Sequence, residues 1–257
     1  ERDFTGSNLS FRSTRGKPSG QYPGSWAPCY STGPSWLVSL GQSIPDLFDW
    51  LMRVDPDYVQ THPGVAGLLV QHSVDVGIRP QRLKEIRTMG ELLEPGVREL
   101  CRRHWDVPVS DNYSAWEAGI IALQCPESTD LHVQSESVLL EVLDSEGKPC
   151  RPGETGRVVV TVLHNFANPL IRYELGDVAE VGGTCACGRG LPVLKRVAGR
   201  VTDTFLLPNG EKVIPIVNSV AMLEITPVRQ FQAIQTGPDD VEIRLVSRRK
   251  LTADEQQ

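Results

Sequence analysis

The chain has 257 residues, of which 40% are hydrophobic and 23% are charged, and its formal net charge is −6. This acidic balance argues against a nucleic-acid-binding protein, which needs a basic face. No apolar run approaches the roughly 20 residues of a membrane-spanning helix, so we expect a cytoplasmic globular protein that binds no membrane. Six cysteines are too sparse for a disulfide framework in a chain of this length.

The first half of the chain alternates predicted helices with short strands. Residues 1–36 are rich in glycine, proline, serine and arginine and show few apolar residues in period, so we predict an irregular loop there. Apolar residues at helical spacing predict helices over 44–54, 65–76 and 95–104. Apolar runs predict strands at 58–59, 83–89 and 107–113. This alternation indicates a layered α/β domain.

The second half is predicted to consist of strands and turns. The strands are expected at 119–125, 138–144, 157–163, 204–207, 211–216, 228–235 and 241–246. We expect a domain boundary near Asp203, with an N-terminally incomplete large α/β domain over 1–203 and the beginning of a small α+β domain over 204–257. The chain does not open on Met, and its last residues, LTADEQQ, are typical of a helix start, so we expect a fragment of a longer protein.

Two carboxylates lie in turns, where binding residues often occur. Glu117 sits between two apolar segments, and a carboxylate there can hold Mg²⁺ through oxygen. Asp177 follows Gly176, and an Asp after a glycine turn can accept hydrogen bonds from both hydroxyls of a ribose. A loop glutamate and a Gly-Asp turn are also common without a ligand, so each residue alone favours an ordinary solvated turn.

The turn-rich run from Leu170 to Asp203 also contains two thiols, Cys185 and Cys187, on a glycine-rich loop. A single intervening residue is a weaker zinc signal than Cys-x-x-Cys. Upstream, Cys125 and His132 offer a further thiol and an imidazole on one loop, and the four residues together would make the closed Cys₃His type of structural zinc site. Three reduced thiols with a surface histidine are equally consistent with this spacing.

Three short motifs give the chain a resemblance to the adenylate-forming ligases. Residues Tyr113–Glu117, Arg172–Asp177 and Gly199–Asp203 occur in the order of that superfamily's motifs Tyr-Gly-x-Thr-Glu, Tyr-Arg-x-Gly-Asp and Gly-Arg-x-Asp-Asp, at similar separations. The residues around them, including Pro169–Tyr173 and Cys185–Arg189, look most like the phenylacetate-CoA ligase branch and its relatives in capsular polysaccharide biosynthesis. The resemblance covers nearly the whole chain.

The resemblance implies an enzyme that joins a carboxylic acid to ATP, giving an acyl adenylate and pyrophosphate, and then transfers the acyl group to coenzyme A. In such an enzyme Glu117 would be a catalytic residue that binds Mg²⁺, and Asp177 would bind the ribose hydroxyls. Arg200 would approach the ribose or the phosphate and would be the second catalytic residue. The residues implied at the adenine are Gly90, Glu91 and Tyr113.

The resemblance to this branch also concerns the thiols, because some members of the branch have a structural zinc ion at similar positions. The resemblance therefore favours zinc over free thiols. The ligands implied are Cys125, His132, Cys185 and Cys187.

Three departures from the motifs leave alternatives open. Ser114 replaces the usual Gly, and Trp116 replaces the usual Thr, whose hydroxyl would contact the α-phosphate. Thr202 stands where the superfamily often has a hinge Asp. The alternatives are a non-catalytic, zinc-stapled nucleotide-binding scaffold and an adenylating enzyme whose acceptor is not coenzyme A. The superfamily's main phosphate loop and adenylation lysine are expected outside these residues, so we predict that the chain alone is inactive.

Overall fold

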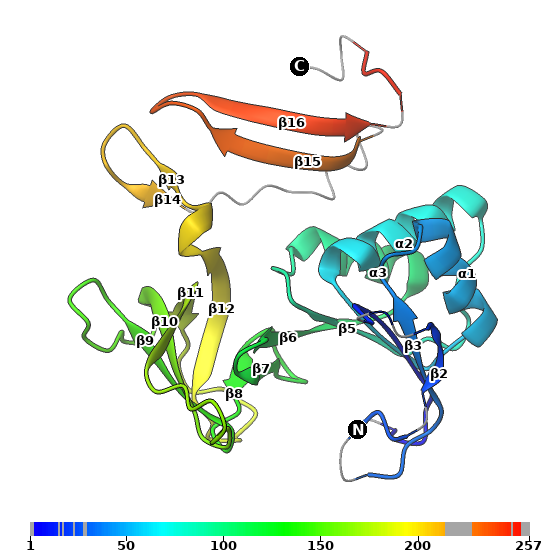
Figure 1. Ribbon diagram of the computed structural model, residues 1–257, viewed down its shortest axis with the longest axis horizontal. Coiled ribbons are helices and arrows are strands. Elements are labelled where there is room, and N and C mark those ends of the chain that lie inside the picture. Colours follow the sequence, from blue (N-terminus) through cyan, green and yellow to red (C-terminus); the bar gives the residue numbers. More distant parts are fainter. Residues whose placement is uncertain are drawn as a thin grey trace.

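A computed structural model describes residues 3–14, 16, 18–22, 24–27, 30–213, 228–247 and 249–252. Its first half comprises β1 (Asn8–Arg12), β2 (Gly20–Tyr22), β3 (Ser35–Ser39), α1 (Ile44–Val54), β4 (Tyr58–Thr61), α2 (Pro63–Val76), β5 (Glu85–Met89), α3 (Pro95–Trp105) and β6 (Val109–Ala115). Strands β3, β1, β4, β5 and β6 pair in parallel in that order, and β2 pairs antiparallel with β3. The three α-helices lie together over one face of these strands (Figure 1).

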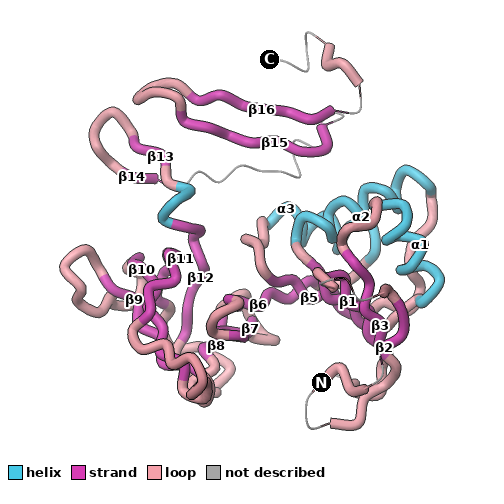
Figure 2. Tube along the Cα trace, in the orientation of Figure 1, coloured by secondary structure: helices cyan, strands magenta, loops and turns pink. Residues whose placement is uncertain are grey.

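The second half of the sheet is antiparallel. Its strands are β7 (Gly119–Gln124), β8 (Leu131–Val133), β9 (Val138–Leu143), β10 (Thr155–Val162), β11 (Tyr173–Val181) and β12 (Val193–Arg200). The order across the sheet is β2-β3-β1-β4-β5-β6-β7-β8-β12-β11-β10-β9, so twelve of the described strands belong to one sheet. Figure 2 shows that the α-helices gather at one end of this sheet, while the other end is built from strands and loops. The predicted layered α/β architecture is confirmed.

Each half of the sheet has its own hydrophobic cluster. The first lies under the helices and contains Leu9 of β1 and Phe48 of α1. The second lies among the antiparallel strands and contains Ile121, Val158 and Leu194. All five of these side chains are at most 2% exposed. The two halves of the sheet are joined by the antiparallel pairing of β6 with β7, whose register shifts between Tyr113 and Ser114.

The helix predicted over 44–54 matches α1 residue for residue. Ser43 caps its N-terminus by accepting a hydrogen bond from a backbone N–H of the first turn. Leu47 and Leu51 lie one turn apart and are buried, as the helical period requires. The other predicted helices, over 65–76 and 95–104, are confirmed as α2 and α3.

The prediction of an irregular loop over residues 1–36 is wrong. This region contains β1, β2 and the start of β3, and β1 is a buried strand between β3 and β4. Leu9 and Phe11 are the only apolar residues of β1. The alternate positions hold Asn8 and Ser10, which are polar but also buried, and Asn8 Nδ2 donates a hydrogen bond to Ser10 Oγ at 3.0 Å. A buried strand with so few apolar residues has no clear signal in the sequence.

The run from Leu170 to Asp203 is not turn-rich throughout, because half of it forms the long strands β11 and β12. Gly176 and Gly199 lie inside these strands with φ of 77° and 137°, a backbone region that side chains other than glycine rarely adopt. Near them the pairing register shifts, since the partners of Val178 and Ala179 are Gly199 and Val197. The glycines thus permit irregular strands here rather than chain reversals.

Beyond the large sheet the chain forms two hairpins. A 3₁₀ turn at Val201–Asp203 precedes them, and they pair β13 (Phe205–Leu206) with β14 (Lys212–Val213) and β15 (Val228–Gln235) with β16 (Val241–Ser247). Strands predicted at 228–235 and 241–246 are confirmed; in the strand predicted over 211–216, residues 214–216 lie outside the described residues. Within the described part of the chain, no helix is long and apolar enough to cross a bilayer.

A buried carboxylate fixes the N-terminal ends of β1 and β4. Asp57, 4% exposed, accepts hydrogen bonds from the Ser7 N–H (2.8 Å) and hydroxyl (2.9 Å) and pairs with Lys84 at 3.0 Å. Burial raises the pKa of Asp57, but the Ser7 donors and Lys84 outweigh it and lower the pKa to about 2. Because this pKa lies below the unfolded-state value, the carboxylate stabilises the fold above about pH 4, and the stabilisation disappears as the pH falls towards 2.

We predict that Asp57→Asn lowers the free energy of unfolding at pH 7 by about 2 kcal/mol and that the deficit shrinks as the pH approaches 2. Urea unfolding of both proteins at several pH values measures this. The exposed Asp49→Asn on α1 is the matched control, because it removes the same charge. A deficit for Asp57→Asn that equals the control's, or that is independent of pH, would contradict the assignment.

Candidate functional site

The carboxyl ends of β4, β5 and β6 lie side by side, because the three strands are adjacent and parallel. In open α/β sheets this edge is where ligands bind. His62 follows β4, Gly90 and Glu91 follow β5, and Glu117 lies in the turn after β6. The sheet topology thus places the predicted adenine and magnesium residues at one edge.

Glu91 is tied to the start of helix α2. Its carboxylate accepts a hydrogen bond from the Gly64 N–H at 3.1 Å and lies 3.4 Å from His62 Nδ1. The neighbouring Glu91 carboxylate raises the pKa of His62, and His62 in turn lowers the pKa of Glu91. His62 was not predicted as a site residue, because a lone histidine gives no signal until the fold brings a carboxylate to it.

Gly90 must lack a side chain for this arrangement. Its φ is 80°, and a Cβ there would lie 3.0 Å from His62 Cε1. The His62 ring therefore packs directly against the Gly90 backbone. The absence of a side chain is the physical reason for glycine at this position.

Tyr113, Asp177 and Arg200 form one contact group. The Tyr113 hydroxyl donates to Asp177 Oδ2 at 2.7 Å, and Arg200 Nε lies 3.3 Å from Asp177 Oδ1. Asp177 and Arg200 are direct partners in the β11–β12 ladder. Burial, followed by the Asp177 charge, raises the pKa of Tyr113, so its hydroxyl stays protonated and remains a donor. The structure thus brings together three residues that span 87 positions of the sequence, from Tyr113 to Arg200.

Glu117 stands apart from this group. Its side chain is exposed in the turn between β6 and β7, and no hydrogen bond or ion pair joins it to another residue in the described part of the chain. A Mg²⁺ ion is commonly held by one or two carboxylates together with phosphate oxygens and waters, so an accessible glutamate fits that role. Trp116 beside it is 78% exposed, a high value for an indole.

The four predicted zinc ligands do converge. Their ligand atoms, three thiol sulfurs and one imidazole nitrogen, all lie within 4.8 Å of one another, so these four described residues could hold a metal ion. Cys125 follows β7, His132 lies in β8, and Cys185 and Cys187 lie on the loop between β11 and β12. The loops are brought together by pairing of β8 with β12, in which His132 faces Val193.

The spacing of this group fits a tetrahedral ion. Cys185 Sγ lies 3.7 Å from Cys125 Sγ, and Cys187 Sγ lies 3.3 Å from His132 Nε2. Zinc–sulfur bonds of ~2.3 Å at tetrahedral angles require sulfur atoms about 3.8 Å apart. Burial alone would raise the pKa of Cys125, but hydrogen bonds from the Glu127 N–H, His132 and Cys185 lower it to about 6, which favours the thiolate that a metal needs.

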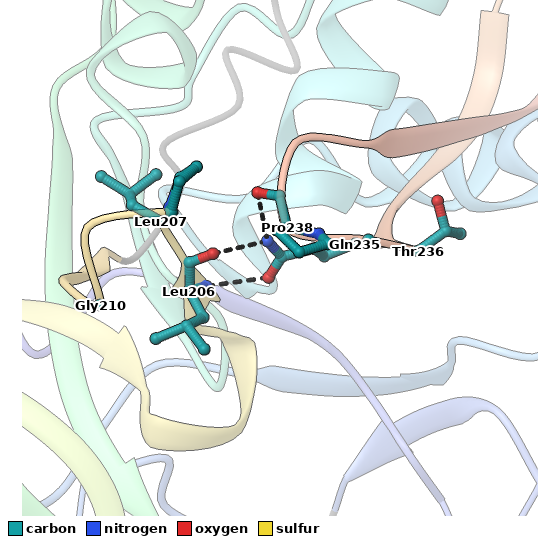
Figure 3. A pocket seen from close by; sticks show the side chains of 8 residues that line it. Leu206, Leu207, Gly210, Gln235, Thr236 and Pro238 are labelled. Carbon is teal, nitrogen blue, oxygen red and sulfur yellow. Dashed lines mark hydrogen bonds between the residues drawn. The ribbon is translucent and has the colours of Figure 1, made fainter.

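A hollow of about 470 Å³ lies between the two C-terminal hairpins (Figure 3). Gln235 closes one side of it, because its side-chain amide accepts from the Leu206 N–H (2.8 Å) and donates to the Leu206 carbonyl (2.7 Å). The residues that line it include no charged side chain. The hollow therefore offers no charged side chain to a phosphate or a metal ion, and none of its lining residues belongs to the contact groups described above.

No protein-family model matches the chain. Among curated proteins, the chain is 27% identical over 201 residues to a phenylacetate-coenzyme A ligase of Thermus thermophilus. The match covers 74% of this chain and 45% of that ligase, so the chain spans less than half the length of this relative.

Solved structures agree with this match. The crystal structure of 2-hydroxyisobutyryl-CoA ligase in complex with R3-HIB-AMP has a TM-score of 0.70 at 22% identity, covering 82% of this chain and 48% of that one. A benzoate CoA ligase from Burkholderia xenovorans LB400 has a TM-score of 0.62 at 15% identity, covering 96% of this chain and 52% of that one. The chain therefore has the fold of the adenylate-forming CoA ligases, and its resemblance to that superfamily is confirmed.

Proposed function

We propose that this chain forms the nucleotide side of an enzyme that activates a carboxylic acid with ATP through an acyl adenylate and then transfers the acyl group to coenzyme A. The observation that supports this most directly is the Asp177 carboxylate, which is held between Tyr113 and Arg200 at the position where the superfamily motif binds ribose. An ATP- and CoA-dependent reaction is in keeping with a cytoplasmic enzyme.

In this proposal the chain's residues position the reactants and do not bond to them. The adenine lies beside the Gly90 backbone, Glu91 and the Tyr113 ring, and the ribose hydroxyls donate to Asp177. Arg200, whose side chain is 62% exposed, would leave its contact with the Leu175 carbonyl to reach the ribose or the α-phosphate. Its positive charge would stabilise the negative charge that develops at the phosphate during attack by the acid.

The role proposed for Glu117 is to hold Mg²⁺ beside the phosphates. Its exposure in the β6–β7 turn and its lack of a partner within the described residues support this. Magnesium bound there would offset the charge of the triphosphate. Trp116 occupies the position of the usual Thr, so this chain would have to supply the α-phosphate contact from another group.

We further propose that the large domain ends at Asp203 and that the small domain begins at Thr204. Supporting this, the last strand of the large sheet ends at Arg200, and a 3₁₀ turn over Val201–Asp203 separates it from the hairpins. A hinge in this turn would let the small domain move between adenylation and thioester formation. Thr202 at the hinge donates to the Asp203 carboxylate at 3.1 Å.

The proposed role of the Cys₃His group is structural zinc. All four tetrahedral positions are taken by protein, so a bound substrate would have no open position. The ion would join the loop after β7 to the loop between β11 and β12. His132 is 4% exposed and its Nδ1 has no hydrogen-bond partner, which leaves Nε2 as the atom directed at the thiols.

The nucleotide site predicts measurable binding of AMP to the chain itself. We expect Asp177→Asn to weaken AMP binding about tenfold by isothermal titration calorimetry, because it removes a charged acceptor of two hydrogen bonds. Glu136→Gln is the matched control, since it removes one exposed negative charge from the same half of the sheet. Equal affinities for the two variants would contradict the ribose assignment. AMP binding by a longer form that makes no acyl adenylate would favour the non-catalytic scaffold.

The metal site predicts about one zinc per purified chain by elemental analysis. We expect Cys187→Ser to lose the zinc and to lower the melting temperature, because binding of a structural ion contributes to folding. Cys150→Ser is the matched control, since Cys150 is a free cysteine outside the Cys₃His group. Zinc retained in Cys187→Ser, or no metal in the wild-type chain, would rule out this site.

A further inference from the structure

We propose that the Tyr113 hydroxyl is a positioning group, which fixes the Asp177 carboxylate so that the site distinguishes a ribonucleotide from its 2′-deoxy counterpart. This rests on the proposed nucleotide site. The role is distinct from contact between the Tyr113 ring and adenine, because it belongs to the hydroxyl alone.

The hydrogen bond joins two distant parts of the sheet. Tyr113 is on β6 and Asp177 is on β11, and β7, β8 and β12 lie between these strands in the sheet order. The sheet must therefore curl for the two side chains to meet. The O–O distance of 2.7 Å is the usual length of a good O–H···O bond. A contact made across such a separation fixes the Asp177 side chain relative to the parallel half of the sheet.

The partners of the carboxylate leave the right number of acceptor positions. Tyr113 occupies one position on Oδ2, and Arg200 faces Oδ1. Each carboxylate oxygen accepts about two hydrogen bonds, so one position remains on each oxygen. Two neighbouring acceptors suit the adjacent 2′- and 3′-hydroxyls of a ribose. A nucleotide without the 2′-hydroxyl would fill only one of them.

Tyr113 is better suited than Arg200 to hold the carboxylate still. The Tyr113 side chain is 9% exposed, so its neighbours fix the ring. The Arg200 side chain is 62% exposed and is held mainly by a hydrogen bond from Nη2 to the Leu175 carbonyl at 3.2 Å. Without the hydroxyl, the carboxylate can rotate, and nucleotide binding has to restrict that rotation.

The test is Tyr113→Phe, which keeps the ring and removes the hydroxyl. Calorimetric affinities for AMP and 2′-deoxy-AMP give the ratio by which each protein prefers the ribonucleotide. We expect AMP binding to weaken about five- to tenfold and 2′-deoxy-AMP binding to change less than twofold, so the ratio falls. In an Asp177→Asn background the same change should have no further effect on the ratio, because the hydroxyl acts through the carboxylate.

Tyr58→Phe is the matched control. Tyr58 is also buried on a parallel strand, and its hydroxyl accepts from the Asp3 N–H, away from the proposed site. We expect it to leave the ratio unchanged. If Tyr113→Phe weakens both nucleotides equally, or leaves both unchanged, the inference is overturned while the nucleotide site stands. If the wild-type chain binds neither nucleotide, the proposed function is overturned as well.

Discussion

The antiparallel pairing of β11 with β12 is the interaction on which both candidate sites depend. At one end of this ladder Asp177 faces Arg200, and at the other end the connecting loop presents Cys185 and Cys187. The same β12 pairs with β8, which contains His132. A change of register in this ladder would therefore disturb the ribose acceptor and the thiol group together. A zinc ion on the loop would oppose such slippage, because strand register is otherwise held only by hydrogen bonds and the buried face.

The nucleotide site draws its other parts from the parallel half of the molecule. That half supplies the Gly90 backbone and Glu91 at the carboxyl ends of its strands, and it has its own hydrophobic cluster. The antiparallel half supplies the charged groups Asp177 and Arg200. Tyr113 connects the two, since its strand belongs to the parallel set and its hydroxyl reaches Asp177. A nucleotide bound between the halves would be sensitive to the curl of the sheet.

Much of the fold could be predicted from local pattern, but the geometry of the site could not. The helix α1 was predictable because its cap and apolar stripe lie within a few residues of one another. Two pairs of possible metal ligands, Cys125 with His132 and Cys185 with Cys187, could be recognised, and the family resemblance favoured zinc, but their meeting depends on the pairing of β8 with β12. Strand β1 could not be predicted, because the buried polar residues Asn8 and Ser10 interrupt its apolar pattern. The His62–Glu91 and Tyr113–Asp177 contacts were out of reach, since each depends on how separate strands meet in space.

In the proposed site an adenine nucleotide binds with its ribose on Asp177, beside Tyr113 and Gly90. The most direct measurement is a crystal structure of the chain with AMP. We expect both ribose hydroxyls within about 3.2 Å of the Asp177 carboxylate oxygens, the Tyr113–Asp177 hydrogen bond retained, and the adenine against the Gly90 backbone. AMP bound elsewhere, or ribose hydroxyls that contact neither oxygen of Asp177, would contradict it.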